Sequence, residues 1–261
     1  MNIKFDGKKF AEIKEAELKE KVKHLKTKLQ LVTILVGDDK ASAIYTKLKG
    51  ESAKRIGINF VVKKFPTTVA AEKLVAEINK LNKDKKVNGI MVQLPLPKSL
   101  KSKTKSILKT INKEKDVDGL TASSPYMPAA VKSVMQILEV ATNSLTYFGK
   151  KAAVVGASGT VGKVIVKELE KKGYKVCECD IDTRDLYAKL HQLDLIVSAT
   201  GEPNLIKGEM VKEGVIIIDV GAPVGDFDKL VGERASFYTP VPGGVGPVTI
   251  VSLLENLVEA V

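Results

Sequence analysis

Three features in the first half of the chain carry side chains whose types and spacing suit catalysis or ligand binding. Tyr45 and Lys49 are four residues apart in a segment with helical periodicity, so a phenol and an ammonium share one helix face. Gln93 lies inside an apolar run just before Pro95, where a buried amide needs hydrogen-bond partners. Asp118 lies in a glycine turn.

Each feature also has an ordinary structural explanation. A Tyr–Lys pair at this spacing is most often solvated helix surface, a buried Gln can satisfy a neighbouring loop, and Asp before Gly is common in turns. The places of Gln93 and Asp118 at the ends of predicted strands favour function, because open α/β sheets bind ligands beyond the carboxyl ends of their strands.

A second candidate site is a glycine turn within residues 150–182. The apolar run 152–155 predicts a buried strand, a helix follows the turn, and residues 174–179 predict a second strand that ends in Asp180 and Asp182. The glycines of the turn are Gly156, Gly159 and Gly162. A helix N-terminus after such a turn offers free N–H groups to a phosphate, and an acid at the end of the next strand suits a ribose hydroxyl. The pattern favours nucleotide binding, although such glycines also allow close packing without a ligand.

The composition is that of an ordinary globular protein, with 44% hydrophobic residues in 261, enough for two medium domains or one large one. No apolar run approaches the roughly 18 residues of a membrane span, and the N-terminal segment lacks the apolar core of a signal peptide. Cys177 and Cys179 share one predicted strand, with no second pair or nearby His to complete a metal site. We therefore expect a cytoplasmic protein with reduced, buried thiols, no membrane association and no bound metal.

Positive charge is concentrated in the first half of the chain. Residues 1–120 hold 28 of the 42 Lys and Arg residues and 14 of the 31 Asp and Glu residues. Nucleic-acid binding is one explanation, but the lysines alternate with glutamates on helix faces, and aromatic residues make up only 5% of the chain. Solvated helix faces are the simpler interpretation, and a third is that positive potential attracts a small polyanionic substrate. We expect no nucleic-acid partner.

The elements that must position these residues alternate between strand and helix. Strands are expected at 29–37, 58–65, 89–97, 152–155, 174–179, 194–200 and 215–221. Helices are expected at 11–29, 42–55 (with Ser42 as N-cap), 69–81, 103–111, 124–143, 164–172, 184–192 and 252–261. The alternation indicates parallel sheets with helices on their faces. The polar segment 113–120 predicts the exit from a first domain, and the loop 238–250 leads to a last helix that returns to it.

Together these motifs resemble the bifunctional methylenetetrahydrofolate dehydrogenase/methenyltetrahydrofolate cyclohydrolase family. The matching segments are VGDDKASAIYTKLK (36–49), NGIMVQLPLP (88–97), KDVDGL (115–120), VVGASGTVGK (154–163), SATGEPNLI (198–206), IIDVGAP (217–223) and TPVPGGVGPVTI (239–250). They occur in the family's order over nearly the whole chain, and QLPLP together with PGGVGP is highly specific. A short-chain dehydrogenase also combines Tyr-x-x-x-Lys with a dinucleotide fold, but there the glycine turn comes first, so the order here excludes it.

The resemblance implies two parallel-sheet α/β domains. The first, residues 1–121 with the C-terminal helix 249–261, would bind folate and carry the catalytic residues. The second, residues 122–248, would be a Rossmann-type NAD(P)-binding domain, with the active-site cleft between the two. The implied function, in one-carbon metabolism, is oxidation of 5,10-methylenetetrahydrofolate followed by hydrolysis to 10-formyltetrahydrofolate. A monofunctional NAD-dependent dehydrogenase is the alternative. A homodimer is implied by the resemblance alone.

The family's functional residues map onto matching positions of this chain. Lys49 would be the central catalytic group, with Tyr45 beside it and Gln93 hydrogen-bonded to it. Asp118 would hold the pterin ring. The PGGVGP loop, with Thr249, is expected to close the cleft near nicotinamide and folate. Its substrate-binding positions are Pro242, Gly243, Gly244 and Thr249. The dinucleotide-binding positions are Gly156, Ala157, Ser158, Gly159, Val161, Asp180, Asp182, Arg184, Thr200, Gly201, Gly221 and Ala222.

The identity of the cofactor is left open by the sequence. NADP is the family's usual cofactor, and Arg184 is a candidate partner for its 2′-phosphate. However, Ala157 replaces the Arg that the family commonly has in this turn, and Asp180 and Asp182 would repel a 2′-phosphate. The residues therefore favour NAD, whereas the resemblance favours NADP.

Overall fold

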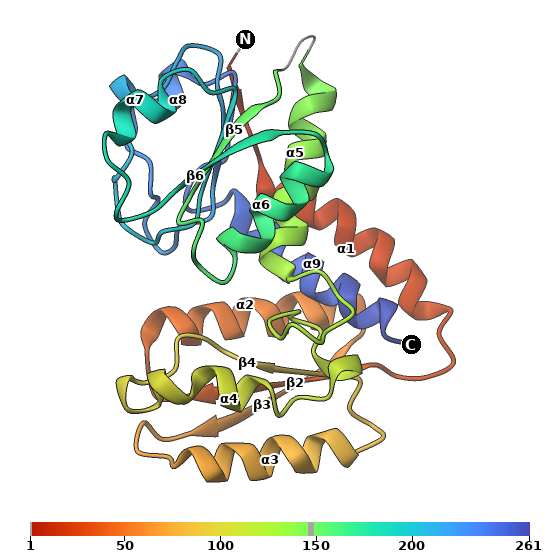
Figure 1. Ribbon diagram of the computed structural model, residues 1–261. Coiled ribbons are helices and arrows are strands. Elements are labelled where there is room, and N and C mark those ends of the chain that lie inside the picture. Colours follow the sequence, from red (N-terminus) through yellow and green to blue (C-terminus); the bar gives the residue numbers. More distant parts are fainter. Residues whose placement is uncertain (1, 146–148) are drawn as a thin grey trace. The chain divides into compact units, whose positions relative to one another are not determined.

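The computed structural model describes residues 2–145 and 149–261, and the chain divides into two compact units, each of α/β type with a parallel sheet (Figure 1). Unit 1 comprises residues 2–10 and the described part of 130–249. Unit 2 comprises residues 11–129 and 250–261. The predicted fold class, two parallel-sheet α/β domains, is confirmed.

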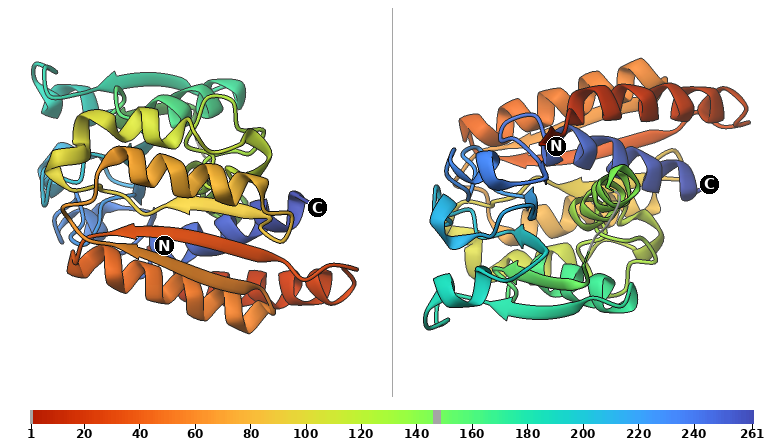
Figure 2. Two further views of the ribbon diagram at one scale, coloured as in Figure 1. Left: turned by 90° about the horizontal axis from the view of Figure 1, so that it is seen from below. Right: turned by 90° about the horizontal axis from the view of Figure 1, so that it is seen from above.

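Unit 2 is built on a three-stranded parallel sheet of order β3-β2-β4. The strands are β2 (Gln30–Val36), β3 (Asn59–Phe65) and β4 (Gly89–Val92). The helices are α1 (Gly7–Lys23), whose first residues belong to unit 1, then α2 (Lys40–Ile56), α3 (Ala71–Lys83) and α4 (Thr104–Leu108). Two 3₁₀ turns lie at Lys98–Lys103 and Lys113–Lys115. Helix α3 covers one face of the sheet and α2 the other (Figures 1 and 2).

Alternation along β2 explains this layering. Val32, Ile34 and Val36 pack with Leu74 and Ile78 of α3 in one buried cluster. The intervening β2 residues point to the opposite face, because successive strand side chains alternate. Both faces of this parallel sheet are therefore covered, as its continuous apolar strands require.

Unit 1 holds a six-stranded parallel sheet of order β1-β9-β8-β7-β5-β6. The strands are β1 (Ile3–Lys4), β5 (Lys151–Val155), β6 (Lys175–Cys179), β7 (Leu195–Ser198), β8 (Ile216–Asp219) and β9 (Phe237–Tyr238). The helices are α5 (Ala129–Ser144), α6 (Gly162–Lys171), α7 (Leu186–Leu190) and α8 (Val231–Arg234), with a 3₁₀ turn at Gly208–Met210. The last helix, α9 (Val245–Glu259), begins in unit 1 and continues into unit 2. The chain changes direction across the sheet at β5, between β6 and β7, and open α/β sheets bind dinucleotides at such a switch point.

The unit boundaries differ from those expected from the sequence. Residues 2–10 were expected in the first domain, but β1 pairs in parallel with β9, so this segment belongs to unit 1. A two-residue strand is too short to produce a period-2 pattern, which is why the sequence gives no sign of it. The middle boundary falls between Ala129 and Ala130, eight residues after the expected position. The last boundary, between Thr249 and Ile250 within α9, is one residue from the expected position.

Several element boundaries also differ from those expected: the first helix is Gly7–Lys23, β4 ends at Val92, and α5 begins at Ala129. Helix α2 begins at Lys40, because the Asp39 side chain accepts a hydrogen bond from the Ser42 N–H at 2.7 Å; Asp39, and not Ser42, is the N-cap. The predicted loop 238–250 is shorter, since α9 begins at Val245. Pro247 falls in the first turn of α9, where a missing N–H is tolerated.

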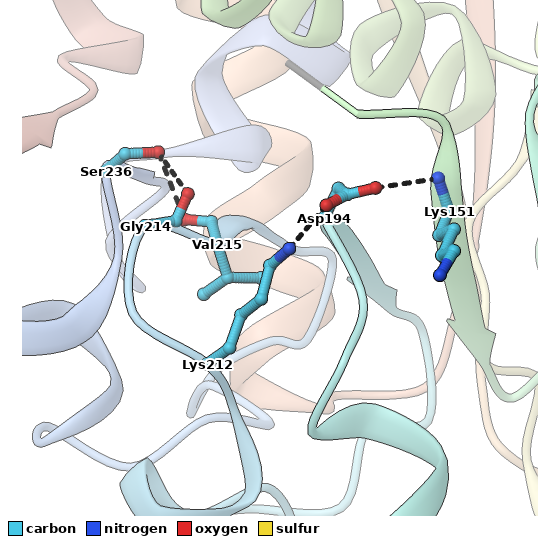
Figure 3. Close-up of polar contacts among 6 residues, drawn as sticks. All are labelled: Lys151, Asp194, Lys212, Gly214, Val215 and Ser236. Carbon is cyan, nitrogen blue, oxygen red and sulfur yellow. Dashed lines mark hydrogen bonds and ion pairs between the residues drawn. The ribbon is translucent and has the colours of Figure 1, made fainter. Parts of the chain in front are cut away.

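The amino ends of the unit 1 strands are tied by polar contacts (Figure 3). The Asp194 carboxylate, just before β7, accepts from the Lys151 N–H of β5 at 2.9 Å and pairs with the Lys212 ammonium. The Ser236 hydroxyl, just before β9, donates to the Gly214 carbonyl at 2.8 Å. These contacts lie at the edge of the sheet opposite to the carboxyl ends, so we assign them a structural role.

None of the helices in the described ranges is long and apolar enough to cross a lipid bilayer.

Candidate active site

The first candidate centre lies in unit 2, around Lys49 of α2. Lys49 is only 7% exposed. Its Nζ donates to Gln93 Oε1 at 2.9 Å and contacts Met91 Sδ at 3.7 Å. The hydrogen bond that the family resemblance implied between Lys49 and Gln93 is therefore present. It joins two residues that are 44 positions apart in the chain.

Hydrogen bonds fix both the backbone and the side-chain amide of Gln93. Its backbone N–H donates to the Ile34 carbonyl at 2.9 Å, which extends the β2–β4 ladder by one residue. Its Nε2 donates to the Leu94 carbonyl at 2.8 Å, which leaves Oε1 to face Lys49. Sequence reasoning missed Met91. Its position two residues before Gln93, on the same face of an alternating strand, was the available signal.

Burial controls the electrostatics of this centre. Desolvation lowers the pKa of the Lys49 ammonium, and the nearby Asp118 carboxylate opposes that change. Desolvation also raises the pKa of Asp118, which the charge on Lys49 counteracts. Burial raises the pKa of the half-buried Tyr45, which keeps its phenol a hydrogen-bond donor. The centre thus combines an amine shifted toward its neutral form with a carboxyl group and a phenol.

Asp118 is positioned by the turn that the sequence predicted. Gly119 adopts a positive φ of 70°, and its N–H donates to the Asp116 carbonyl at 3.0 Å. The buried Asp116 carboxylate accepts from the Thr121 N–H at 2.9 Å and from its hydroxyl at 2.6 Å. The Ala129 N–H donates to the Asp118 carbonyl at 3.1 Å. The Asp118 side chain therefore projects from an ordered turn.

The second candidate centre is the glycine turn of unit 1, between β5 and α6. Gly156 has φ of 86°, and its N–H donates to the Cys179 carbonyl at 2.8 Å. A Cβ on Gly162 would lie 2.0 Å from the Gly156 carbonyl oxygen, so only glycine lets α6 begin so close to the turn. No side-chain hydrogen bond caps α6 at Val161 within the described chain. The Lys163 and Val164 N–H groups at the start of α6 donate to the Gly159 and Val161 carbonyls, each at 3.1 Å. The tight glycine geometry between β5 and α6 is that of a dinucleotide turn.

The acid expected at the end of the second strand is engaged with this turn. The Asp180 carboxylate accepts from the Ser158 N–H at 3.0 and 3.1 Å and from its hydroxyl at 2.8 Å. Ala157 is fully buried and Gly159 is exposed, with its N–H bonded to the Gly156 carbonyl at 3.1 Å. Two further predicted residues, Asp182 and Arg184, are exposed.

The remaining dinucleotide positions lie at the carboxyl ends of the next two strands. Thr200 and Gly201 follow β7, and a Cβ on Gly201 would meet no atom within 4 Å. Gly221 and Ala222 follow β8; Gly221 is buried and Ala222 exposed. All twelve predicted dinucleotide positions thus lie in unit 1, after the carboxyl ends of β5, β6, β7 and β8.

The PGGVGP loop also belongs to unit 1. The Gly7 N–H donates to the Gly243 carbonyl at 3.0 Å, and a Cβ on Gly7 would lie 1.9 Å from the Gly244 carbonyl oxygen. Pro242 is exposed. The Thr249 hydroxyl lies 3.1 Å from the Val245 carbonyl and 3.0 Å from the Ser133 hydroxyl. These four predicted substrate positions therefore fall in a different unit from Lys49 and Asp118.

Comparison with known proteins shows the family of the chain. Residues 5–118 match the model of the tetrahydrofolate dehydrogenase/cyclohydrolase catalytic domain, and residues 128–261 match that of the corresponding NAD(P)-binding domain. The chain belongs to the tetrahydrofolate dehydrogenase/cyclohydrolase family. It is 40% identical to "Bifunctional protein FolD" of Nautilia profundicola, over 98% of this chain and 95% of that protein.

Solved structures agree with this family assignment. The bifunctional FolD enzyme of Campylobacter jejuni superposes with a TM-score of 0.89 and 40% identity, covering 98% of this chain and 96% of that one. The Trypanosoma brucei FolD enzyme, complexed with NADP cofactor and inhibitor, gives a TM-score of 0.91 at 30% identity, covering 99% and 97%. The predicted family and bifunctional enzyme class are confirmed: the chain is a methylenetetrahydrofolate dehydrogenase and methenyltetrahydrofolate cyclohydrolase.

Proposed function

We propose that both reactions of the family are carried out here by two residue sets, one in each unit. In the first reaction, 5,10-methylenetetrahydrofolate is oxidised to 5,10-methenyltetrahydrofolate. In the second, the methenyl bridge is hydrolysed to 10-formyltetrahydrofolate. The observation that carries the proposal is the buried Lys49, held at 2.9 Å by Gln93, in a chain that also contains a dinucleotide turn.

Lys49 is the proton-transfer group of the hydrolysis. Water must attack a cationic carbon, and protons must move between water and the folate nitrogens. An amine whose pKa is lowered by burial releases its proton more readily than an exposed lysine and can take it back during the reaction. Gln93 directs the amine, and Tyr45 presents its phenol one helical turn away. The retained Lys49–Gln93 pair is the reason we favour a bifunctional enzyme over a monofunctional dehydrogenase.

Asp118 is the residue that we assign to pterin binding. Its half-buried carboxylate lies on an ordered turn beside Lys49, and a pterin presents N–H donors to such an acceptor. Because burial raises the pKa of Asp118, a hydrogen-bonded ligand would restore part of the solvation that the carboxylate has lost.

The dehydrogenase reaction depends mainly on positioning. When bound, the nicotinamide ring supplies the hydride acceptor. A nitrogen lone pair of the substrate assists departure of the hydride, so no strong protein base is required. Gly156, Gly159 and Val161 would hold the pyrophosphate at the start of α6. The other end of the dinucleotide would contact the loops after β7 and β8. The substrate-side contacts would come from Pro242, Gly243, Gly244 and Thr249.

NAD is the cofactor that we infer for this chain. The Ser158 N–H and hydroxyl both donate to the Asp180 carboxylate, which follows the end of β6. A 2′-phosphate would have to displace that carboxylate and would meet its charge. Ala157 supplies no cation in return. A ribose hydroxyl, by contrast, can donate to Asp180. NADP, which the T. brucei relative binds, is the competing assignment, with the exposed Arg184 as its partner.

Three further properties are inferred. The excess of Lys and Arg in residues 1–120 would attract the polyanionic glutamate tail of the folate substrate. The two free cysteines are consistent with a reducing, cytoplasmic location. A homodimer is expected from family resemblance, and light scattering after gel filtration would test it.

The proposed function is tested with the purified protein and two substrates. The absorbance of reduced nicotinamide is followed with 5,10-methylenetetrahydrofolate and either NAD or NADP. Decay of 5,10-methenyltetrahydrofolate without nucleotide is followed separately. We expect both activities, with the higher dehydrogenase kcat/KM for NAD. Reduction without hydrolysis would support the monofunctional alternative, and absence of both activities would contradict the proposed function.

A further inference from the structure

A buried carboxylate outside the predicted site joins the two loops that follow β7 and β8. Asp226 is fully buried. Its Oδ2 accepts from the Ser198 hydroxyl at 2.6 Å. The same oxygen accepts from the N–H and the hydroxyl of Thr200, both at 2.8 Å, and is 3.4 Å from the Gly201 N–H. One oxygen of Asp226 therefore receives every hydrogen bond that this carboxylate makes to the end of β7.

The backbone holds Asp226 in this place. The Asn204 N–H donates to the Gly225 carbonyl at 3.0 Å, and the Ile206 N–H donates to the Asp226 carbonyl at 3.0 Å. Ile206 and Phe227 form a parallel bridge. The loop after β7 and the loop after β8 are thus joined along several residues, and the Asp226 side chain lies at the end nearest the strands.

A second carboxylate shapes the loop that carries Asp226. Asp219, the last residue of β8, accepts from the N–H groups of Gly221 at 2.9 Å, Asp226 at 3.2 Å and Phe227 at 3.3 Å. A Cβ on Gly221 would lie 2.4 Å from Asp226 Oδ1 and 2.9 Å from Asp219 Oδ1. Gly221 is therefore in close contact with both carboxylates. Asp226 Oδ1 itself is buried without a hydrogen-bond partner among the residues that the structure describes.

We propose that Asp226 is a positioning residue for the dinucleotide: its carboxylate fixes Thr200 and Gly201 against Gly221. The inference rests on the proposed function, in which this edge of the sheet binds the dinucleotide. The strand order supports this role of Asp226. Asp180, the proposed acceptor for the ribose hydroxyl, follows β6, and β7 and β8 lie on the other side of β5. A dinucleotide that crosses the switch point extends from β6 toward β7 and β8. Asp226 thus acts through the loops that would receive the nicotinamide half.

Removal of the carboxylate has a defined consequence for the loops. Without it, the Ser198 hydroxyl and the Thr200 N–H lose their acceptor, and buried donors without partners are unfavourable. The loops would relax to satisfy these donors elsewhere. Cofactor binding should therefore weaken, whereas Lys49, Gln93 and Asp118 belong to unit 2 and should keep their contacts.

The test uses three variants of the full chain, with Asp194 as the matched control. Asp226→Ala removes the acceptor, and Asp226→Asn keeps a carbonyl oxygen that can still accept from Thr200. Asp194→Ala removes a carboxylate that also joins strands of this sheet, but at their amino ends (Figure 3). We expect the KM for the preferred nucleotide to rise at least about tenfold in Asp226→Ala and less in Asp226→Asn. Nucleotide-independent hydrolysis of 5,10-methenyltetrahydrofolate should stay within about twofold of the unmodified protein.

For Asp194→Ala we expect a lower melting temperature with an unchanged nucleotide KM. If Asp226→Ala does not fold, Ser198→Ala removes one donor and leaves the carboxylate, and the nucleotide KM should rise about two- to fivefold. An unchanged nucleotide KM in the folded Asp226 variant, or an equal loss of both activities in the Asp226 and Asp194 variants, would overturn the inference. Failure of the proposed function is distinguished from failure of this inference, because it would appear as a lack of dehydrogenase activity in the unmodified protein.

Discussion

Asp180→Ser is the substitution that tests the inferred cofactor preference most directly. In the structure, Asp180 occupies both donors of Ser158 and carries the negative charge at the end of β6. A serine at position 180 removes the negative charge and leaves the Ser158 N–H and hydroxyl able to bind a ligand. We expect the ratio of kcat/KM for NADP to kcat/KM for NAD to rise, because the variant can accept a 2′-phosphate and has lost the charged acceptor for a ribose hydroxyl.

The size of the effect follows from the contacts of Asp180. A phosphate that used the same donors, 2.8–3.1 Å from the carboxylate oxygens, would place two negative charges within about 4 Å. At that separation a pair of unit charges repels by about 1 kcal/mol in water and about 4 kcal/mol near a protein surface. Asp180 is only half-buried, so solvent and salt reduce the repulsion to about 1–2 kcal/mol. The NADP/NAD ratio should therefore rise by about 5- to 30-fold.

The assay is initial-rate reduction of each nucleotide with saturating 5,10-methylenetetrahydrofolate. Glu178→Gln is the matched control, because it removes an exposed negative charge from β6, two residues before Asp180. In Glu178→Gln the NADP/NAD ratio of kcat/KM should change by less than about twofold. An unchanged ratio in Asp180→Ser, or an equal change in Glu178→Gln, would refute the role given to the Asp180 carboxylate.

Three further predictions concern the other parts of the site. Lys49→Met should lower the rate of 5,10-methenyltetrahydrofolate hydrolysis by about 10²- to 10⁴-fold. Lys49→Arg should be equally impaired, because a guanidinium does not give up its proton. Unchanged turnover in either variant would contradict the proton-transfer role of Lys49. Gly162→Ala should lower the free energy of unfolding by more than about 2 kcal/mol in urea titrations, since its Cβ would lie 2.0 Å from the Gly156 carbonyl oxygen; an equally stable variant would contradict the close packing of α6. Burial raises the pKa of Asp219 from 3.8 to about 6. A raised carboxyl pKa favours the protonated folded form, so about 3 kcal/mol of stability is present below pH 3.8 and lost as pH rises through about 6. Urea titrations at several pH values should show this loss, and Asp219→Asn should remove it; the same pH slope in both proteins would contradict the role of Asp219.

Much of this protein was determined by short stretches of sequence. Continuous apolar runs predicted the buried strands, and glycines at 57 and 173 marked helix ends because only glycine readily adopts the positive φ of 95° and 82° found there. The glycine turn of residues 156–162 and the acid after the next strand predicted a nucleotide site for similar local reasons. The pairing of Lys49 with Gln93 was inferred from family resemblance, since no local pattern joins residues so far apart.

Other features were decided only by the tertiary structure. Strand β1 exists because β9, more than 230 residues later, offers a free edge to pair with, and two residues alone carry no periodic signal. Asp226 looks in the sequence like any Asp near a glycine turn. Its importance depends on three donors, from Ser198 and Thr200, that the fold brings to one oxygen. Local geometry is encoded within a few residues, but partners in long-range contacts are defined only when the chain is folded.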